Sequence, residues 1–322
     1  MIAARGALTL RGFIALPAHE LGGFDHAAVD RGRRRLIVAH TANHAADVID
    51  TREDRWVRSI EGLKGAAGAW VDEARGLAFT SNRGEDTVAW FPIESQEVPG
   101  AASAGRTAVT KVTVGARPNG LALDGENAIL LSANIGDPER GAPPSVTLVE
   151  VRERRAIATL PMPGRTRWTL FDPLAGVFYV NLAEPAEIVV LRSSPTPEIH
   201  QRIPVPARGP HGLEFDPARG LLYCACDDAH LVALDPRSGR VKGSLALSGA
   251  PDVIFLDAGA ARLYVAIGDP GVIDVVDVER WKQVETVATE RGAHTLALDD
   301  STHRVYSFLP ASHRAAVYQG TS

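Results

Sequence analysis

The stretch GLEFDPARGLLYCACDDAHLVALDPRSGRVKGSLAL, residues 212–247, decides the fold of this chain. Four short runs rich in apolar side chains alternate in it with turn sequences of the Asp-Pro-x-x-Gly kind. We predict strands over residues 212–216, 221–226, 231–235 and 240–247, connected as an antiparallel sheet. One sheet of this size cannot bury both of its faces, so it must pack against similar sheets.

The end of the first strand, an apolar-x-apolar-Asp sequence, recurs through the whole chain. Its seven copies end at aspartates that lie 42, 52, 48, 44, 41 and 42 residues apart: Asp30, Asp72, Asp124, Asp172, Asp216, Asp257 and Asp299. A repeat of this length made of strands predicts an all-β, seven-bladed β-propeller. An aspartate that opens a turn accepts a hydrogen bond from the backbone two residues on, so we interpret these aspartates as turn formers.

Closure of the ring is predicted from the two ends of the chain. Blades of four antiparallel strands are expected over residues 23–63, 64–116, 117–164, 165–207, 208–249, 250–291 and 292–320. The last copy holds only three strands, whereas residues 8–16 alternate like a strand before the first copy. We predict that residues 8–16 pair with the last blade, so that one domain spans residues 1–322. Closure of this kind removes two exposed sheet edges.

The bulk composition limits the functions to be considered. The 322 residues are 45% hydrophobic and 23% charged, with a net charge of −5, which is typical of a folded globular domain. The chain lacks the basic footprint of a nucleic-acid-binding protein and any apolar run near the ~18 residues of a membrane span. Residues 1–6 lack the pattern of a secretory signal. We therefore expect a cytoplasmic protein that binds neither nucleic acid nor membranes. We make no prediction about its oligomeric state.

The two cysteines, Cys224 and Cys226, lie two residues apart on one predicted strand. That spacing places them on one face about 6.6 Å apart, with poor geometry for a disulfide. We expect them to be buried free thiols.

Several short sequences carry a resemblance to a known family: Tyr179-Val180-Asn181, Tyr264-Val265-Ala266, Phe79-Thr80-Ser81-Asn82, Val48-Ile49-Asp50 and Pro118-Asn119-Gly120. They resemble the YVTN-repeat, YncE-like family of seven-bladed propellers, over essentially the whole chain. The resemblance implies the fold and assigns no function, because such propellers host unrelated activities. More distantly, the chain is similar to gluconolactonase-type and streptogramin-lyase propellers, which hold a divalent metal in the central channel. Their catalytic motifs find no residue-by-residue match here, so no catalytic role is transferred.

The residue that begins the first strand of each blade is expected to point toward the axis, at the mouth of the central channel. Counting back five positions from each repeat aspartate gives a ring of seven residues: Asp25, Ala67, Asn119, Arg167, His211, Asp252 and His294. Six of the seven are polar or charged, whereas a channel filled by packing alone would be lined by small or apolar residues. Once the ring closes, one half of it comes from consecutive blades: His211, Asp252, His294 and Asp25.

Imidazole and carboxylate groups together suit a divalent metal ion, namely Zn²⁺, Mn²⁺, Fe²⁺ or Ca²⁺. We therefore expect this half of the ring to bind a metal. The alternative is a polar ring that holds only ordered water, because a narrow channel must satisfy its buried polar groups. His26 would replace Asp25 if the strand began one residue later.

The other half of the mouth is expected to bind substrate. Arg167 presents a planar fork suited to a carboxylate, and Asn119 could orient a carbonyl. Loops after the second strand of each blade rise on the same face and add Asn82, Arg83, Asn134, Asn181, Asp227 and Asp228, while Trp168 is the nearest aromatic residue. His40 and His44 lie in such a loop as well, as a ligand pair or as solvated histidines. Residues 134–145 form a long loop there, either a lid or a surface insertion, and the remaining histidines are expected at the surface: His19, His200, His230, His303 and His313.

These residues favour a metal-dependent hydrolase or lyase acting on a small cyclic ester or a similar carbonyl compound. The metal would polarise the carbonyl and lower the pKa of bound water toward ~7, with His26 or His40 as general base. Nucleotide and quinone cofactors are not expected, because glycine-rich phosphate loops and repeated Trp docking motifs are absent from the sequence. The alternative is a non-catalytic scaffold that recognises a peptide or protein on the same face, although the mouth loops offer few aromatic anchors.

Overall fold

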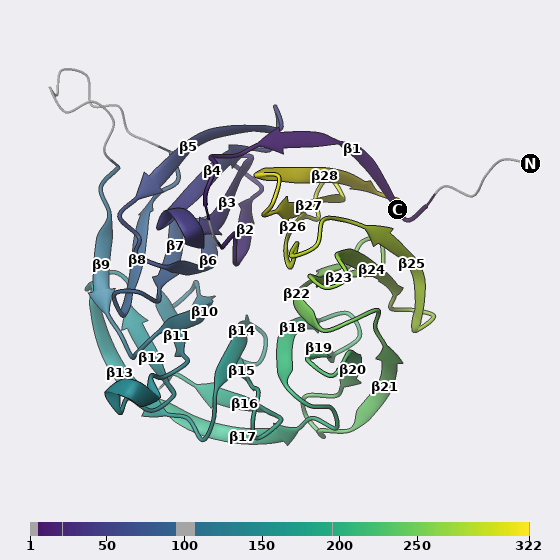
Figure 1. Cartoon of the computed structure of the whole chain (residues 1–322). Helices are drawn as coiled ribbons and strands as arrows, with labels where there is room; N and C mark the ends of the chain where they lie inside the picture. Colours follow the sequence, from purple (N-terminus) through teal and green to yellow (C-terminus); the bar gives the residue numbers. More distant parts are fainter. Residues whose placement is uncertain (1–5, 21, 95–106, 195, 322) are drawn as a thin grey trace, which may run out of the picture.

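The strands of the molecule form seven four-stranded antiparallel sheets arranged around a central axis (Figure 1). This computed structural model describes residues 6–20, 22–94, 107–194 and 196–321. In each sheet one edge strand lies nearest to the axis and the other edge strand lies on the rim. The predicted seven-bladed propeller is therefore confirmed. The sequence also predicts a long connection over residues 94–106, rich in Ala, Gly and Ser and on the face opposite the mouth, but it falls almost entirely outside the described residues.

The blades follow in chain order. Blades one to three consist of β2 (Ala27–Asp30), β3 (Arg35–His40), β4 (Ala45–Asp50) and β5 (Arg55–Glu61); β6 (Ala66–Asp72), β7 (Leu77–Asn82), β8 (Thr87–Pro92) and β9 (Thr110–Thr113); and β10 (Pro118–Asp124), β11 (Ile129–Asn134), β12 (Ser145–Glu150) and β13 (Arg155–Pro161). Blades four to six consist of β14 (Thr166–Asp172), β15 (Val177–Leu182), β16 (Glu187–Arg192) and β17 (Glu198–Pro204); β18 (Pro210–Asp216), β19 (Leu221–Cys226), β20 (His230–Leu234) and β21 (Val241–Ala246); and β22 (Pro251–Asp257), β23 (Arg262–Ile267), β24 (Val272–Asp277) and β25 (Lys282–Ala288). Blade seven consists of β26 (Thr295–Asp299), β27 (Arg304–Leu309) and β28 (Arg314–Gly320), completed by β1 (Leu8–Ala15).

The first strand of the chain closes the ring, as predicted. β1 pairs antiparallel with β28, from Leu8 opposite Gly320 to Ala15 opposite Arg314. Its Ile14 side chain is only 2% exposed and packs into the core between blades seven and one. β1 thereby covers the edge of β28, whose backbone groups would otherwise be open to pairing with another chain.

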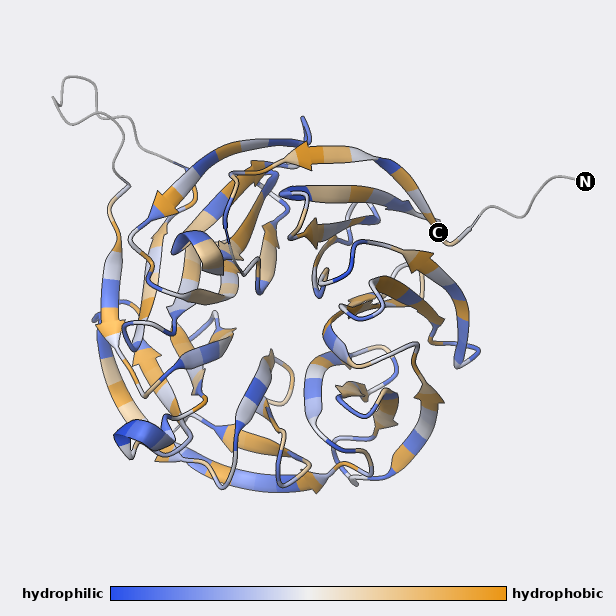
Figure 2. Cartoon of the chain, viewed as in Figure 1, coloured by the Kyte–Doolittle hydropathy of each residue, from blue (hydrophilic) through white to orange (hydrophobic). Residues whose placement is uncertain are grey.

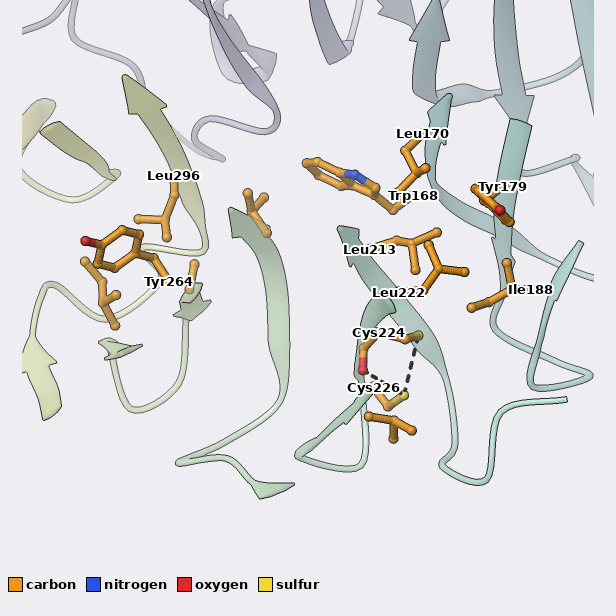
Figure 3. Packing of buried hydrophobic residues seen from close by; sticks show 14 of the residues in the cluster. Trp168, Leu170, Tyr179, Ile188, Leu213, Leu222, Cys224, Cys226, Tyr264 and Leu296 are labelled. Atoms are coloured by element: carbon orange, nitrogen blue, oxygen red, sulfur yellow. Dashed lines mark hydrogen bonds between the residues drawn. The ribbon is translucent and has the colours of Figure 1, made fainter. Parts of the chain in front are cut away.

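The core lies between the blades, because their two middle strands are apolar on both faces. In β19, for example, every residue after Leu221 is buried. Outer strands such as β25 alternate exposed and half-buried residues instead, and Figure 2 shows the corresponding mixture of colours on the rim. Figure 3 shows part of one core cluster, in which Cys224 and Cys226 are buried and free, with their Sγ atoms 3.9 Å apart. Buried thiols were predicted for this pair.

The turn between the first two strands of each blade has the repeat aspartate as its hydrogen-bond acceptor. Asp30 accepts from the backbone N–H of Arg33, and Asp216 accepts from that of Arg219. The bond usually reaches three residues on, not the two expected from sequence. This hydrogen bond from the turn backbone is present in six blades, whereas in the seventh Asp299 accepts from the hydroxyl of Ser301.

Helical structure is confined, within the described ranges, to two short 3₁₀ turns, η1 (Thr41–Asn43) and η2 (Pro138–Arg140). No helix among the described residues has the length and apolar character needed to cross a membrane. η2 lies in the long loop of blade three, where Arg140 forms ion pairs with Asp86 and Asp137. The pair with Asp86 ties the loop to blade two, whereas the pair with Asp137 lies within the loop. The lid function of this long loop stays a prediction.

Candidate functional site: the channel mouth

The residues that begin the inner strands leave the regular pairing pattern. In blades two to six the register between the first and second strands shifts over the ring residue and the residue after it. Irregularities of this kind turn side chains out of the sheet and are common beside functional sites. Here they free pairs such as Arg167-Trp168 to point toward the axis.

Glycine follows the ring residue where neighbouring blades approach most closely. A Cβ atom on Gly212 would lie 2.5 Å from the carbonyl oxygen of Asp252, and one on Gly120 would lie 2.5 Å from that of Arg167. No side chain fits at such distances. The glycines therefore set how tightly the blades, and the ring residues that they carry, come together at the mouth.

His211 lies at the centre of a charged network. Its Nδ1 is 2.7 Å from Asp227 Oδ1 and its Nε2 is 3.0 Å from Asp252 Oδ1. Burial alone would lower the pKa of His211, but the charge of Asp252 and hydrogen bonds to both carboxylates raise it to about 9, against the opposing charge of Arg167. His211 is therefore an imidazolium cation at neutral pH, and both of its ring nitrogens are donors.

Asp252 is surrounded by histidines. Burial would raise its pKa, but the charges of His211, His294 and His26 and its hydrogen bond with His211 lower it well below the ordinary range. Asp25 has a different partner, because its Oδ2 lies 2.8 Å from Arg83 Nη2.

The four predicted metal ligands thus make three separate sets of contacts. His211 and Asp252 touch, Asp25 pairs with Arg83, and the Nδ1 of His294 lies 2.8 Å from the carbonyl of Gly292. Over the part of the chain that the structure describes, no three His, Cys, Asp or Glu side chains gather in a way that could hold a metal ion. The metal site stays a prediction.

His26 lies just below this network. It is buried, its Nε2 is 3.3 Å from Asp25 Oδ1, and its ring packs 4.3 Å, centroid to centroid, from that of Trp168. Burial lowers the pKa of His26, and the charges of Arg83 and His211 act in the same direction against those of Asp25 and Asp252. The imidazole is therefore neutral at pH 7, as a general base must be.

Arginines dominate the remaining part of the mouth. Arg83 donates to Asn119 as well as to Asp25, and Arg167 donates to Asp227. Beyond them lie Arg117 and Arg165, both exposed, which form no ion pair among the described residues. Partial burial lowers the pKa of Arg165, and so do the charges of Arg167, Arg117 and Arg83. Four guanidinium groups therefore share one region of the mouth.

Other predicted site residues lie elsewhere. His40 ends β3, is fully buried and is joined to Asp47 and His19 at 2.8 Å each, so none of its described partners belongs to the mouth. His44 instead accepts from the backbone N–H of Gly65, and the two histidines do not form one site. Of the five histidines expected at the surface, only His200 is exposed, whereas four are half-buried: His19, His230, His303 and His313.

The buried amides of Asn82 and Asn134 bond within their own blades. Asn82 bonds the hydroxyls of Thr80 and Thr87, and Asn134 bonds hydroxyls in β11 and β12. Asn181, in contrast, donates to the carbonyls of His211 and Gly212 and supports the mouth from blade four.

A cavity of about 360 Å³ lies in the channel beyond the mouth. Trp168 stands between the two regions, because its indole packs against His26 on one side and lies 6.2 Å, edge to face, from Phe255. Figure 3 shows this indole directed away from its own strand. Trp70, Leu298 and other apolar side chains line the cavity, which ends at three charged residues of the opposite face: Arg31, Glu73 and Asp300. Sequence reasoning missed it, although Trp70 and Phe255 occupy equivalent positions, three after the ring residue.

Comparisons with known proteins add no assignment: no protein-family model matches this chain, and no curated protein matches it.

Proposed function

We propose that the mouth of this propeller binds a small organic acid through its carboxylate. The observation that supports this most directly is the group of four arginines around Arg165, in a chain whose net charge is −5. With His211 the cations there number five, against three carboxylates from Asp25, Asp227 and Asp252. The surplus of positive charge favours an anion.

The kind of anion follows from the geometry of the donors. Guanidinium groups offer two parallel N–H donors, which match a planar carboxylate. Arg117 and Arg165 are the groups that are free to do so, because Arg83 and Arg167 already hold Asp25 and Asp227. The roles expected for Arg83, Asn119 and Arg167 therefore include positioning the ring around the bound anion.

Calorimetric titration with acetate, succinate, citrate and gluconate tests this proposal. Arg165→Gln and Arg117→Gln should each weaken binding about tenfold, the usual size of one lost charged hydrogen bond. The matched control is Arg155→Gln, which removes an exposed arginine that pairs with Glu153 on the outer strand β13. If all three variants bind the organic acids equally tightly, the proposal is wrong.

Hydrolysis of a lactone-like substrate is the second candidate function, and neutral His26 beside Asp25 favours it. A carboxylate would then be the product that the arginines hold. A lactone screen on wild type and on His26→Gln, with and without chelator, tests both the base and the predicted metal, and metal analysis of the purified protein tests the metal alone. Membership of the YVTN-repeat, YncE-like family stays a proposal, which rests on the repeat sequences.

A further inference from the structure

We infer that the central cavity is a second binding site, separate from the mouth, which takes a small aromatic amine in its ammonium form. The cavity of about 360 Å³ lies within the range of small-molecule pockets. Its shape comes from the inner strands of several blades, so it is a feature of the closed ring. The inference does not rest on the proposed function of the mouth.

The walls of the cavity favour a cation with an aromatic or apolar body. Three aromatic residues line it, namely Trp70, Trp168 and Phe255, and the remaining wall is mostly aliphatic. The faces of aromatic rings attract cations, and tryptophan attracts them best. Thr169 also lines the cavity, and its buried hydroxyl has no hydrogen-bond partner in the part of the chain that the structure describes.

A carboxyl group on a neighbouring blade occupies the matching position of its strand, although it is not one of the residues that line the cavity. Glu214 occupies on β18 the position, three residues after the ring residue, that Trp70 and Phe255 occupy on β6 and β22. Burial raises the pKa of Glu214 to about 8; the backbone of Phe215 lowers it and the charge of Asp300 raises it. Glu214 is half-buried and forms no ion pair among the described residues, and Asp300, whose charge acts on it, does line the cavity, so an ammonium ligand there would lie near a carboxyl group that it could ionise.

The charges at the two ends of the channel also differ in sign. At the far end Arg31 bridges Glu73 and Asp300, at 2.8 Å and 3.2 Å, so one cation meets two carboxylates. The side chains of Arg31 and Asp300 are 51% and 47% exposed, which leaves them free to move aside. An amine is therefore attracted from this face and repelled by the arginines of the mouth.

The test uses three probes with one skeleton: 2-phenylethylamine, 2-phenylethanol and phenylacetate. Calorimetry at pH 7.5 should show the amine binding at least about tenfold more tightly than the alcohol, with phenylacetate weakest in the cavity. Glu214→Gln, which is nearly isosteric, should lower the amine to the level of the alcohol and leave the alcohol unchanged. Trp70→Ala should weaken amine and alcohol alike, and Trp70→Phe, which keeps an aromatic ring, should retain most of the binding.

A mouth variant separates the two sites. Arg165→Gln should leave the affinity for 2-phenylethylamine unchanged, whatever it does to organic acids. Equal affinities for amine and alcohol, a Glu214→Gln variant that binds the amine like wild type, or loss of amine binding in Arg165→Gln would each overturn the inference. The first two outcomes would show that the carboxyl does not select the ligand, and the third would place the amine at the mouth.

Discussion

Asp252→Asn should lower the pKa of His211 by more than one unit and flatten the dependence of stability on alkaline pH. The pKa of His211 is raised to about 9, mainly because the charge of Asp252 and the two carboxylate hydrogen bonds outweigh burial. Histidine in an unfolded chain titrates near 6.5. The difference of about 2.5 units, at about 1.4 kcal/mol each, amounts to about 3 kcal/mol of stability.

The sign follows from which state binds the proton more tightly. The folded state does, so this stability is fully present below pH 6.5 and is lost as the pH rises through about 9. His26 has its pKa lowered and therefore contributes in the opposite sense, but its change falls below pH 6.5. Glu214, whose pKa is raised to about 8, also loses stability as the pH rises to that value, so His211 is read from the difference between wild type and Asp252→Asn in the window from pH 6.5 to 9.5.

Two measurements decide the matter. Urea unfolding at pH 6.5, 8 and 9.5 should show Asp252→Asn losing at least about 1.5 kcal/mol less stability across the window than the wild type, which is half of the contribution of His211. NMR titration of the imidazole nitrogens should give the pKa of His211 directly. Asp235→Asn, which removes a carboxylate from an exposed turn, serves as control and should behave like wild type. A wild-type His211 that titrates near 6.5, or one unaffected by Asp252→Asn, would refute the reasoning.

Three further predictions concern the architecture that carries the mouth. Ile14→Ala in the closing strand should cost about 2–4 kcal/mol in chemical unfolding because it empties a buried position, whereas Leu10→Ala, on the same strand but 48% exposed, should change little. Gly212→Ala should lower the unfolding midpoint and disturb the mouth, since its Cβ would meet a backbone carbonyl at 2.5 Å; Gly125→Ala, with nothing within 4 Å of the new atom, is the matched control. Burial and the charges of two neighbouring histidines lower the pKa of His19, so its contribution to stability is present above pH 6.5 and lost on acidification. His19→Gln should therefore make the free energy of unfolding less dependent on pH between pH 7 and 5, and the same pH dependence in variant and wild type would contradict this.

The sequence predicts the architecture far better than the chemistry of the site. The spacing of the repeat aspartates locates the start of each inner strand, because every blade has nearly the same length. It cannot predict the partners of the side chains placed there. Asp25 shows why. It precedes the inner strand of blade one, at the ring position counted from the sequence, but its carboxylate pairs with Arg83 of the next blade and not with the other predicted metal ligands. The loop position expected for His40 is wrong for a related reason. β3 extends one residue further than predicted, so that His40 belongs to the strand and is buried beside Asp47.

The register shift at the start of the inner strands links the two sites of the channel. Because two successive residues leave the pairing pattern, one blade supplies Arg167 to the mouth and Trp168 to the layer beneath it. The same two positions hold Asp25 and His26 in blade one. The polar ring and the aromatic layer beneath it therefore come from the same pair of positions, and a ligand bound at the mouth would contact the indole of Trp168 and the imidazole of His26, which separate the mouth from the cavity. Replacement of Trp168 by alanine would remove that separation, so that organic acids and amines would then compete in a single continuous channel, whereas in the wild type they should bind independently.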